Sequence, residues 1–381
     1  MKGLYYYTKR TYQFSQSKQV FERLGGTFII NWEYPMTILH FLIRYGPFRI
    51  RLMGKRFSRI DRSVKGIILC HSGEYIVPPG KNYRRVFVYH GTCDTVYKAQ
   101  GPDDKLLAEW FEYYFVTGDK DLHKLRKYTY NADKLEGKIV RTGMFRSDSI
   151  ITGSFDREKI LRKYGIHSDG KKIVLYAPTW AYGGGTLSEL FETFAKEIPK
   201  QYVLIVRPHA NDRVAIKYIR SWQRSHHVRD LYIFPKPAQD IMDFVSIADV
   251  LIGDNSAVNY DFVLTGRPLV LVRSDEHENL FVPPDEYNIK LCVPMYEHGK
   301  DSILEKIEVA LHNPEYKKRT AALVHNSFYF NDGHVVDRVC SFIVDALSDM
   351  GVVDREKVMR KYGKRFEYRS DYIFKTESPL Q

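Results

Sequence analysis

Short runs of apolar residues alternate with longer amphipathic stretches along most of the chain. In the first half the apolar runs are Leu4 to Tyr7, Thr27 to Asn31, Gly66 to Cys70, Val86 to Tyr89, Tyr114 to Thr117 and Ile139 to Thr142. In the second half they are Lys172 to Tyr176, Tyr202 to Val206, Tyr232 to Phe234, Val250 to Ile252 and Leu269 to Val272. Runs of this length predict buried strands, and the stretches between them predict helices, among them Ser15 to Leu24, Glu158 to Tyr164 and Val335 to Leu347. Strands alternating with helices predict βαβ units and parallel sheets with helices on both faces.

Two such halves predict an α/β fold with two Rossmann-like, doubly wound domains facing a cleft. The length of 381 residues agrees, because a domain typically holds about 150 residues. We place an N-terminal domain at residues 1–150, a C-terminal domain at 151–347 and a basic tail at 348–381. Periodicity alone leaves open whether the last helix and the tail cross back to the first domain.

Composition describes a globular chain whose basic residues gather near its ends. Hydrophobic residues make up 44% and charged residues 27%, which excludes collagen-like and mostly disordered chains. The net charge is +12, yet residues 1–65 hold 13 Lys/Arg against 3 Asp/Glu, and residues 66–350 hold 37 against 38. The excess positive charge therefore favours a localised anionic partner, either a membrane surface or a nucleic acid.

The cysteines and the hydropathy of the chain indicate the cellular compartment in which we expect the protein. The four cysteines are too scattered for a zinc knuckle or a disulfide framework, so we expect a reducing, cytoplasmic setting. No uncharged apolar run approaches the roughly 20 residues that span a bilayer. A protein of this kind that meets a membrane is expected to lie on its surface.

The basic segment from Trp32 to Lys65 interleaves aromatic and aliphatic residues with arginines and lysines. This mixture is typical of an interfacial helix on anionic lipid headgroups. The alternative is a helix of the first domain with its apolar face in the core. Nucleic acid is the third interpretation, but no RNA- or DNA-binding motif accompanies the charge, so we expect no nucleic-acid partner.

Polar residues follow four of the predicted strands, where ligands of open parallel sheets bind. After the first of these, His90-Gly91-Thr92 offers an imidazole that can take a proton, a glycine that admits a phosphate and a hydroxyl; a turn cap is the alternative. Thr179 and Trp180 follow the second, ahead of three glycines, in what is either a ligand-approached loop or an ordinary βα loop.

The other two strand ends favour anions. Arg207-Pro208-His209 is either a phosphate contact or a structural ion pair. In Asp254-Asn255-Ser256, Asn255 and Ser256 would occupy the N-terminus of a predicted helix, where a phosphate is favoured, and the alternative is that Asp254 or Asn255 is a plain N-cap.

Taken in order, these signatures resemble the CDP-glycerol glycerophosphotransferase family, which primes and polymerises teichoic acids and related capsule polymers. The matching motifs are His90-Gly91-Thr92, Thr142-Gly143-Met144-Phe145-Arg146-Ser147-Asp148, Tyr176-Ala177-Pro178-Thr179-Trp180, Arg207-Pro208-His209, Asp254-Asn255-Ser256-Ala257 with Asp261-Phe262, and Asp332-Gly333 with Arg338. The chain departs from the family pattern at Cys93-Asp94-Thr95, Ala181, Asn255 and Ala257. The resemblance covers roughly residues 84–345.

The resemblance implies a GT-B architecture and a transfer of glycerol phosphate from CDP-glycerol, or a related CDP-activated donor, to a hydroxyl of a lipid-linked polymer acceptor, with release of CMP. It implies no metal and no cofactor. His90 would be the general base, and His209 a second catalytic residue beside Arg207 at the pyrophosphate. The remaining expected nucleotide- or phosphate-binding residues are Gly91, Thr92, Thr179, Asp254, Asn255, Ser256 and Asp261. For Asp261 the alternative is an ordinary exposed carboxylate on a helix. The expected location is the cytoplasmic face of the cell membrane, bound peripherally.

Two alternatives of other classes stay open. One is a GT-B glycosyltransferase, or a ribitol-phosphate transferase, that uses another nucleotide-activated donor. The other is a nucleotide-binding protein without transferase activity, which the departures at Cys93-Asp94 and Ala257 raise.

Overall fold

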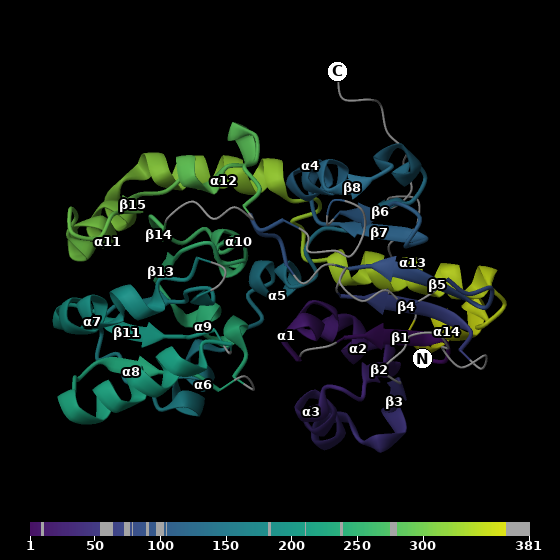
Figure 1. Ribbon diagram of the computed structural model, residues 1–381, viewed down its shortest axis with the longest axis horizontal. Helices are drawn as coiled ribbons and strands as arrows, with labels where there is room; N and C mark the ends of the chain where they lie inside the picture. The colour runs from purple at the N-terminus through teal and green to yellow at the C-terminus, as the bar shows by residue number, and fades with distance from the viewer. Residues whose placement is uncertain are drawn as a thin grey trace. The chain divides into compact units, whose positions relative to one another are not determined.

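The protein forms two compact units, each built on a parallel sheet (Figure 1). The computed structural model describes residues 1–8, 11–53, 64–71, 77, 79–88, 91–96, 103, 105–181, 184–209, 211–236, 239–274 and 280–362. Unit 1 comprises Met1–Thr92, Tyr97–Asp148 and Phe328–Gln381. Unit 2 comprises Cys93–Val96 and Ser149–Ser327. The chain therefore passes between the units more than once.

Unit 1 contains a seven-stranded sheet with the order β3-β2-β1-β4-β5-β7-β9. Its strands are β1 (Leu4–Tyr7), β2 (Thr27–Asn31), β3 (Ile50–Met53), β4 (Gly66–Cys70), β5 (Tyr83–Phe87), β7 (Tyr113–Val116) and β9 (Ile139–Arg141). Every neighbouring pair is parallel, and in the centre Tyr5 pairs with Thr27 on one side and Ile68 on the other. The short strands β6 (Leu106–Leu107) and β8 (Thr129–Tyr130) form a separate parallel pair.

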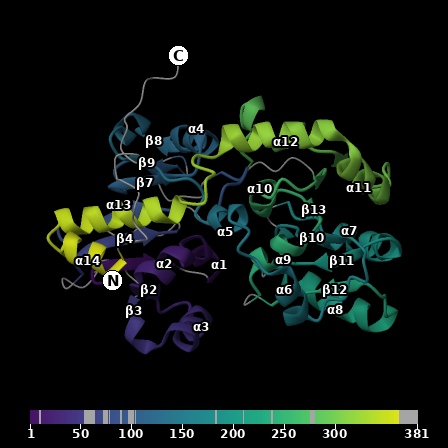
Figure 2. The ribbon, with the colours of Figure 1, turned by 180° about the vertical axis from the view of Figure 1, so that it is seen from behind.

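Helices cover both faces of this sheet. They are α1 (Thr11–Phe14), η1 (Ser15–Ser17), α2 (Lys18–Leu24), α3 (Pro35–Tyr45), η2 (Pro47–Arg49), α4 (Asp119–Lys127), η4 (Ala132–Leu135), α13 (Val335–Asp349) and α14 (Arg355–Tyr362), with α5 (Ser147–Ile151) at the unit's limit. Because side chains alternate along a strand, Leu4 and Tyr6 of β1 pack with α2 and α13, whereas Tyr5 and Tyr7 pack with α4. Figure 2, the view from behind, shows α13 running along the sheet. Both faces are thus buried, which explains why its strands are apolar runs rather than alternating patterns.

Unit 2 contains a six-stranded sheet with the order β12-β11-β10-β13-β14-β15. Its strands are β10 (Ile173–Tyr176), β11 (Val203–Val206), β12 (Leu231–Ile233), β13 (Val250–Gly253), β14 (Leu269–Val272) and β15 (Met295–Tyr296). Its helices are α6 (Arg157–Tyr164), α7 (Leu187–Glu197), η6 (Ile198–Lys200), α8 (Arg213–His226), α9 (Ile241–Ile247), α10 (Val258–Val263), η7 (Asp285–Tyr287), η8 (Ile289–Leu291), α11 (Ile303–His312) and α12 (Pro314–Ser327). Helices α7, α8 and α11 share one apolar core with the sheet, and α9 and α10 contact β10 and β13.

The predicted fold class, α/β with doubly wound parallel sheets, is confirmed by these topologies. The sequence-based domain limits at residues 150 and 347 stay a prediction. In the structure, residues 328–347 belong to unit 1 and not with residues 151–327. The physical reason is that α13 buries a long apolar face, including Val339, Phe342 and Ile343, against the sheet of unit 1.

The predicted single helix in the basic segment is wrong. Residues 35–45 form α3, but Ile50–Met53 form β3, which pairs with β2 at the edge of the sheet. Gly46, with φ of +80°, ends the helix, and Pro47 begins the short turn that leads to the strand. Residues 54–63 of that segment, and residues 363–381 of the expected basic tail, lie outside the described part of the chain. Among the described residues, no helix combines the length and the apolar character needed to cross a bilayer.

Candidate functional site

The sheet of unit 2 reverses its direction of winding between β10 and β13. From β10 the chain continues to β11 and β12 on one side, and from β13 to β14 and β15 on the other. In open parallel sheets, ligands bind beyond the carboxyl ends of the strands at such a reversal. Thr179 follows β10 and Asp254 follows β13, so the structure places two of the predicted residues at this point.

Asp254 joins the two strand ends. Its Oδ1 accepts from the backbone N–H of Thr179 at 2.9 Å, and its Oδ2 accepts from the N–H and the hydroxyl of Thr186, each at 3.1 Å. The Asp254 side chain is fully buried, and desolvation raises its pKa to about 6. Its two oxygens are therefore used inside the protein, where they hold both ends of the loop between β10 and α7.

The loop between β10 and α7 is tightened by further contacts. Gly185 donates to the carbonyl of Trp180 at 3.1 Å, and a Cβ at Gly185 would lie 2.2 Å from the carbonyl oxygen of Thr179. Only glycine fits at that position. The N–H of Ala181 donates to Asp212 Oδ1 at 2.9 Å, which ties the loop to the segment after β11.

Arg207 and His209 lie at the end of β11. The Arg207 guanidinium donates to the carbonyls of Pro208 at 2.8 Å and Gln239 at 3.0 Å, and burial lowers its pKa. Its Nε is buried and has no hydrogen-bond partner among the described residues. Among the described residues, Arg207 therefore binds backbone carbonyls and has no carboxylate partner.

His209 is a neutral imidazole at pH 7. Burial, and then the charge of Arg207, lowers its pKa to about 4. Its Nδ1 accepts from the backbone N–H of Asn211 at 3.2 Å, so the proton of the neutral ring is on Nε2. The ring lies 6.3 Å from the Trp180 ring, centroid to centroid. Thus Thr179, Trp180, Arg207 and His209 come from loops that the contacts of Asp254 and Asp212 hold together.

The predicted phosphate-binding residues around α10 make contacts within the protein. Asn255 Nδ2 donates to the Ser274 hydroxyl at 2.9 Å, and Ser256 Oγ accepts from the N–H of Val258 at 3.3 Å. Ser256 therefore closes a turn just before α10, whose N-cap is Ala257 and which has only six residues. The alternative that Asp254 or Asn255 is the plain N-cap of this helix is wrong. Asp261 is fully buried, so the alternative of an exposed helical carboxylate is wrong.

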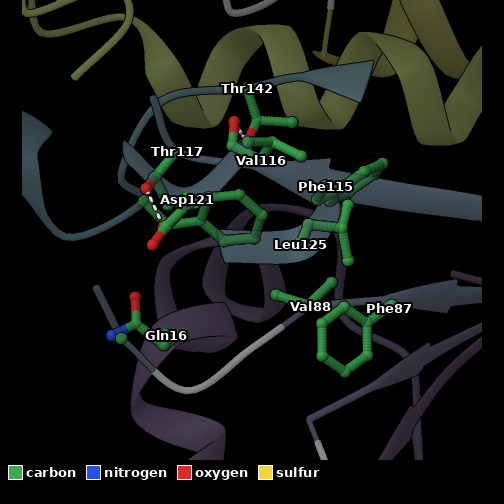
Figure 3. Close-up of a pocket in the computed structure, with 11 residues that line it drawn as sticks. Gln16, Phe87, Val88, Phe115, Val116, Thr117, Asp121, Leu125 and Thr142 are labelled. Atoms are coloured by element: carbon green, nitrogen blue, oxygen red, sulfur yellow. Dashed lines mark hydrogen bonds between the residues drawn. The ribbon is translucent and has the colours of Figure 1, made fainter. Parts of the chain in front are cut away.

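In unit 1, His90 lies outside the described residues, but Gly91 and Thr92 do not. Gly91 has φ of +145°, a conformation that favours glycine, and lines a pocket at the carboxyl ends of β5, β7 and β9. The pocket is small, with a cavity volume of about 20 Å3, and its walls include Val88, Phe115 and Asp121 (Figure 3). Thr92 is fully buried and its hydroxyl contacts Asp121.

Two of the family-like motifs meet within unit 1. Asp148 accepts from the N–H groups of Val335 at 2.9 Å and Val336 at 2.8 Å, at the first turn of α13. Arg338 of that helix binds both carboxylate oxygens of Asp332, one of them at 2.9 Å. The motif that ends at Asp148 and the motif Asp332-Gly333 with Arg338 therefore form one helix-capping assembly.

Sequence reasoning missed Thr186, Asp212 and Asp121. Asp212 follows His209 by three residues, and Asp121 lies just beyond the predicted strand Tyr114 to Thr117. Inspecting polar residues after the strand Tyr114 to Thr117 finds Asp121, and following the chain three residues beyond His209 finds Asp212. Thr186 carries no such signal, because its role depends on a partner 68 residues away. Among the described residues, no group of three or more His, Cys, Asp or Glu side chains has the arrangement of a metal site.

Comparison with known proteins decides the family. The profile of CDP-Glycerol:Poly(glycerophosphate) glycerophosphotransferase matches residues 90–345. The chain belongs to this family. The predicted resemblance is thereby confirmed.

Curated relatives include two enzymes of Bacillus spizizenii. The chain is 28% identical to a teichoic acid poly(glycerol phosphate) polymerase over 156 residues, which are 38% of this chain and 37% of the relative. It is 23% identical to a teichoic acid poly(ribitol-phosphate) polymerase over 229 residues, 57% of this chain and 35% of the relative. The chain thus spans little more than a third of the length of these two relatives.

Among solved structures, the wall teichoic acid polymerase TagF superimposes with a TM-score of 0.65 at 15% identity, covering 91% of this chain and 89% of that one. At this identity the likeness shows the fold. The predicted GT-B-like fold class is confirmed.

Proposed function

We propose that this member of the family is a CDP-glycerol glycerophosphotransferase of teichoic-acid-like polymer synthesis. The observation that carries the proposal is the family match over residues 90–345, which includes the histidines and arginine of the motifs. In the transfer, the oxygen of an acceptor hydroxyl forms a bond to the glycerol-bearing phosphorus of CDP-glycerol. The bond from that phosphorus to the bridging oxygen breaks, CMP leaves with that oxygen, and the hydroxyl proton passes to a base.

The residues divide this work by their chemistry. His90 is the proposed base, since an imidazole titrates near neutral pH. Arg207, through its positive charge, and His209 stabilise the pyrophosphate oxygens, where negative charge grows as CMP departs. Thr179, Asn255, Ser256 and Asp261 shape the nucleotide site, and Gly91, which has no side chain, leaves room for a phosphate. Positioning and charge neutralisation supply most of the catalysis in phosphoryl transfer.

The test is release of CMP. Purified protein is incubated with CDP-glycerol and membranes that carry a lipid-linked acceptor, and CMP is measured chromatographically. We expect release by the wild type and a loss of about 10²- to 10⁴-fold in His90→Ala, because that is the usual contribution of a general base. His312→Ala is the matched control, since His312 lies exposed on α11.

Other outcomes separate the alternatives. Turnover of CDP-ribitol or of a nucleotide sugar, with none of CDP-glycerol, would overturn the proposed donor. Nucleotide binding without turnover of any CDP- or UDP-activated donor would favour the non-enzymatic alternative.

We further propose that unit 1 binds the anionic membrane that holds the acceptor. In and next to α3, the apolar side chains of Met36, Ile43 and Phe48 are 74%, 79% and 100% exposed. Arg44, Arg49 and Arg51, their neighbours in the sequence, are exposed as well. Exposed apolar side chains and arginines in one segment match the two layers of a lipid surface, the acyl chains and the phosphates. The proposed location is accordingly the cytoplasmic face of the membrane.

A further inference from the structure

Helix α8 of unit 2 presents a row of positive charge to solvent. Its arginines and lysine follow the spacing i, i+4, i+7 and i+11, and all of them are exposed: Arg213, Lys217, Arg220 and Arg224. Residues at this spacing lie on one face of an α-helix, and at a rise of about 1.5 Å per residue they extend over about 16 Å. The helix contains no Asp or Glu. We call these four residues the α8 basic face.

The charges of the α8 basic face are not neutralised within the described part of unit 2. The ion pairs there join other cations to carboxylates, for example Lys196 to Glu192 at 2.8 Å, and none of them includes a residue of this face. Glu192 also accepts from the hydroxyl of Tyr218 on α8, but its charge is already paired with Lys196. Since residues 66–350 as a whole are nearly neutral, this face is a local excess of positive charge.

The α8 basic face begins next to the candidate site. Helix α8 follows β11, so its first residue lies toward the carboxyl edge of the sheet, where ligands of such sheets bind. Its N-cap is Asp212, whose N–H donates to the carbonyl of His209 at 3.0 Å and whose Oδ1 accepts from the N–H of Ala181. Arg213 comes directly after Asp212, and the other three cations lead away from that edge along the helix. A chain that has one end in the site can therefore run along this face.

From this arrangement we propose that the α8 basic face binds the phosphate groups of the anionic polymer that accepts the transferred unit. The inference rests on the proposed function, in which each transfer adds one phosphodiester, and hence one negative charge, to the acceptor. Successive phosphorus atoms of a chain joined through both ends of glycerol are as many bonds apart as the ends of two extended amino-acid residues, roughly 7 Å. The face is thus long enough to contact roughly three phosphates of one chain through its cations.

A lipid surface is a poorer match for α8. The apolar face of the helix, with Ile219 and Trp222, is buried in the core of unit 2, so it cannot enter the acyl chains. Two apolar side chains of the helix are exposed, Val214 and Tyr218, and the hydroxyl of Tyr218 is bonded to Glu192. A helix that lies in a membrane surface needs an apolar face that lipid can bury. A polyanion requires only the exposed cations.

Direct binding tests this inference. The probe is a fluorescently labelled synthetic glycerol phosphate oligomer, and its affinity is measured by anisotropy at several salt concentrations. The triple variant Lys217→Ala, Arg220→Ala and Arg224→Ala removes three charges without disfavouring the helix. We expect it to bind the oligomer at least about fivefold more weakly than the wild type, and with a weaker dependence on salt, because three exposed charge contacts are lost.

The matched control removes three other exposed lysines of unit 2, in the variant Lys200→Ala, Lys317→Ala and Lys318→Ala. Oligomer affinity within about twofold of the wild type in this control supports the proposal. A loss equal to that of the α8 triple variant would show that net charge alone decides, and would overturn it. Anionic vesicles and single-stranded RNA are the comparison probes. If the α8 triple variant loses binding to one of these while its binding to the oligomer is unchanged, the proposal is overturned in favour of that partner.

Kinetics separate this inference from the proposed function. In the CMP-release assay, we expect the α8 triple variant to use an acceptor with a single glycerol phosphate unit as well as the wild type does, because that acceptor is too short to extend along the face. With longer acceptors its kcat/KM should fall about fivefold or more. A wild type that is active on CDP-glycerol, with the triple variant unchanged in both assays, overturns the role of α8 alone. A wild type that releases no CMP overturns the proposed function.

Discussion

Single buried carboxylates organise both units, and each binds protein groups before any ligand. Asp254 holds Thr179 and Thr186, Asp148 holds the start of α13, and Asp121 holds Thr92. The sequence predicts a site role for Asp254 because it follows a buried strand at a predicted helix start, and that role stays a prediction. Its partner at Thr186 was beyond prediction, because a hydrogen bond over 68 residues depends on tertiary packing.

Two of the site residues have opposite effects on stability as pH falls. Burial raises the pKa of Asp254 from 3.8 to about 6, so the folded protein takes up this proton before the unfolded chain does. Burial and Arg207 lower the pKa of His209 from 6.5 to about 4, so there the unfolded chain takes up the proton first. Acidification from pH 7 to pH 4 therefore favours the folded state through Asp254 and disfavours it through His209.

We expect the opposing contributions of Asp254 and His209 to the pH dependence of the unfolding free energy largely to cancel in the wild type. Replacing one of the two residues should reveal the contribution of the other. Relative to Asp254→Asn, the wild type gains on the order of 3 kcal/mol of unfolding free energy between pH 7 and pH 4, the equivalent of a shift of two pKa units. Relative to His209→Gln, it loses stability between pH 6.5 and pH 4. Urea unfolding at several pH values measures both. Parallel pH curves for the wild type and Asp254→Asn would contradict the burial of that charge.

At the scale of elements, apolar runs located the strands well because most strands are buried on both faces. The run Leu4 to Tyr7 coincides with β1, and the run Leu269 to Val272 coincides with β14. Strand β3 was missed because an edge strand keeps charged side chains, here Arg51, and resembles the basic segment around it. The two-residue strand β15 was missed because so short a run carries no period.

Helix α13 depends on a cap that comes from a distant motif. Replacing Asp148 with Ala leaves the buried N–H groups of Val335 and Val336 without acceptors, and such groups cost about 1–3 kcal/mol each when unpaired. We expect Asp148→Ala to lower the free energy of unfolding by about 2 kcal/mol or more, measured by urea denaturation. Asp345→Ala is the control, because the ion pair of Asp345 with Arg355 is partly exposed and worth about 1 kcal/mol or less. Equal effects of the two substitutions would argue against the capping role.

At the scale of the whole molecule, the charge of residues 1–65 coincides with the exposed apolar side chains of α3. Each Lys or Arg at an anionic surface contributes about 1 kcal/mol, and salt screens this attraction. Binding therefore requires both the arginines and the apolar side chains. The sequence predicted that basic and apolar residues are mixed in this segment. It did not predict the conformation, because the segment forms helix α3 followed by strand β3 and not one helix.

We expect the protein to co-sediment with vesicles that contain anionic lipid, less so as salt rises, and only weakly with neutral vesicles. Ile43→Glu combined with Phe48→Glu should weaken this binding at least about tenfold, since both side chains lose their contact with the acyl region. Val214→Glu is the matched control, as Val214 is 84% exposed on α8 of unit 2. Equal binding to neutral and anionic vesicles would contradict an electrostatic contribution.

The position of α13 in the core of unit 1 also governs how the protein is made. The sheet residues of that unit emerge from the ribosome by Asp148, but the helix that covers one of their faces ends at Asp349. At a synthesis rate of about 5–20 residues per second, the intervening 200 or so residues take roughly 10 to 40 s. During that interval unit 2 can complete its sheet while the first sheet still exposes an apolar face. A nascent chain of this protein is thus a substrate for chaperones until its last core helix is released, and the second unit to be synthesised is the first able to fold.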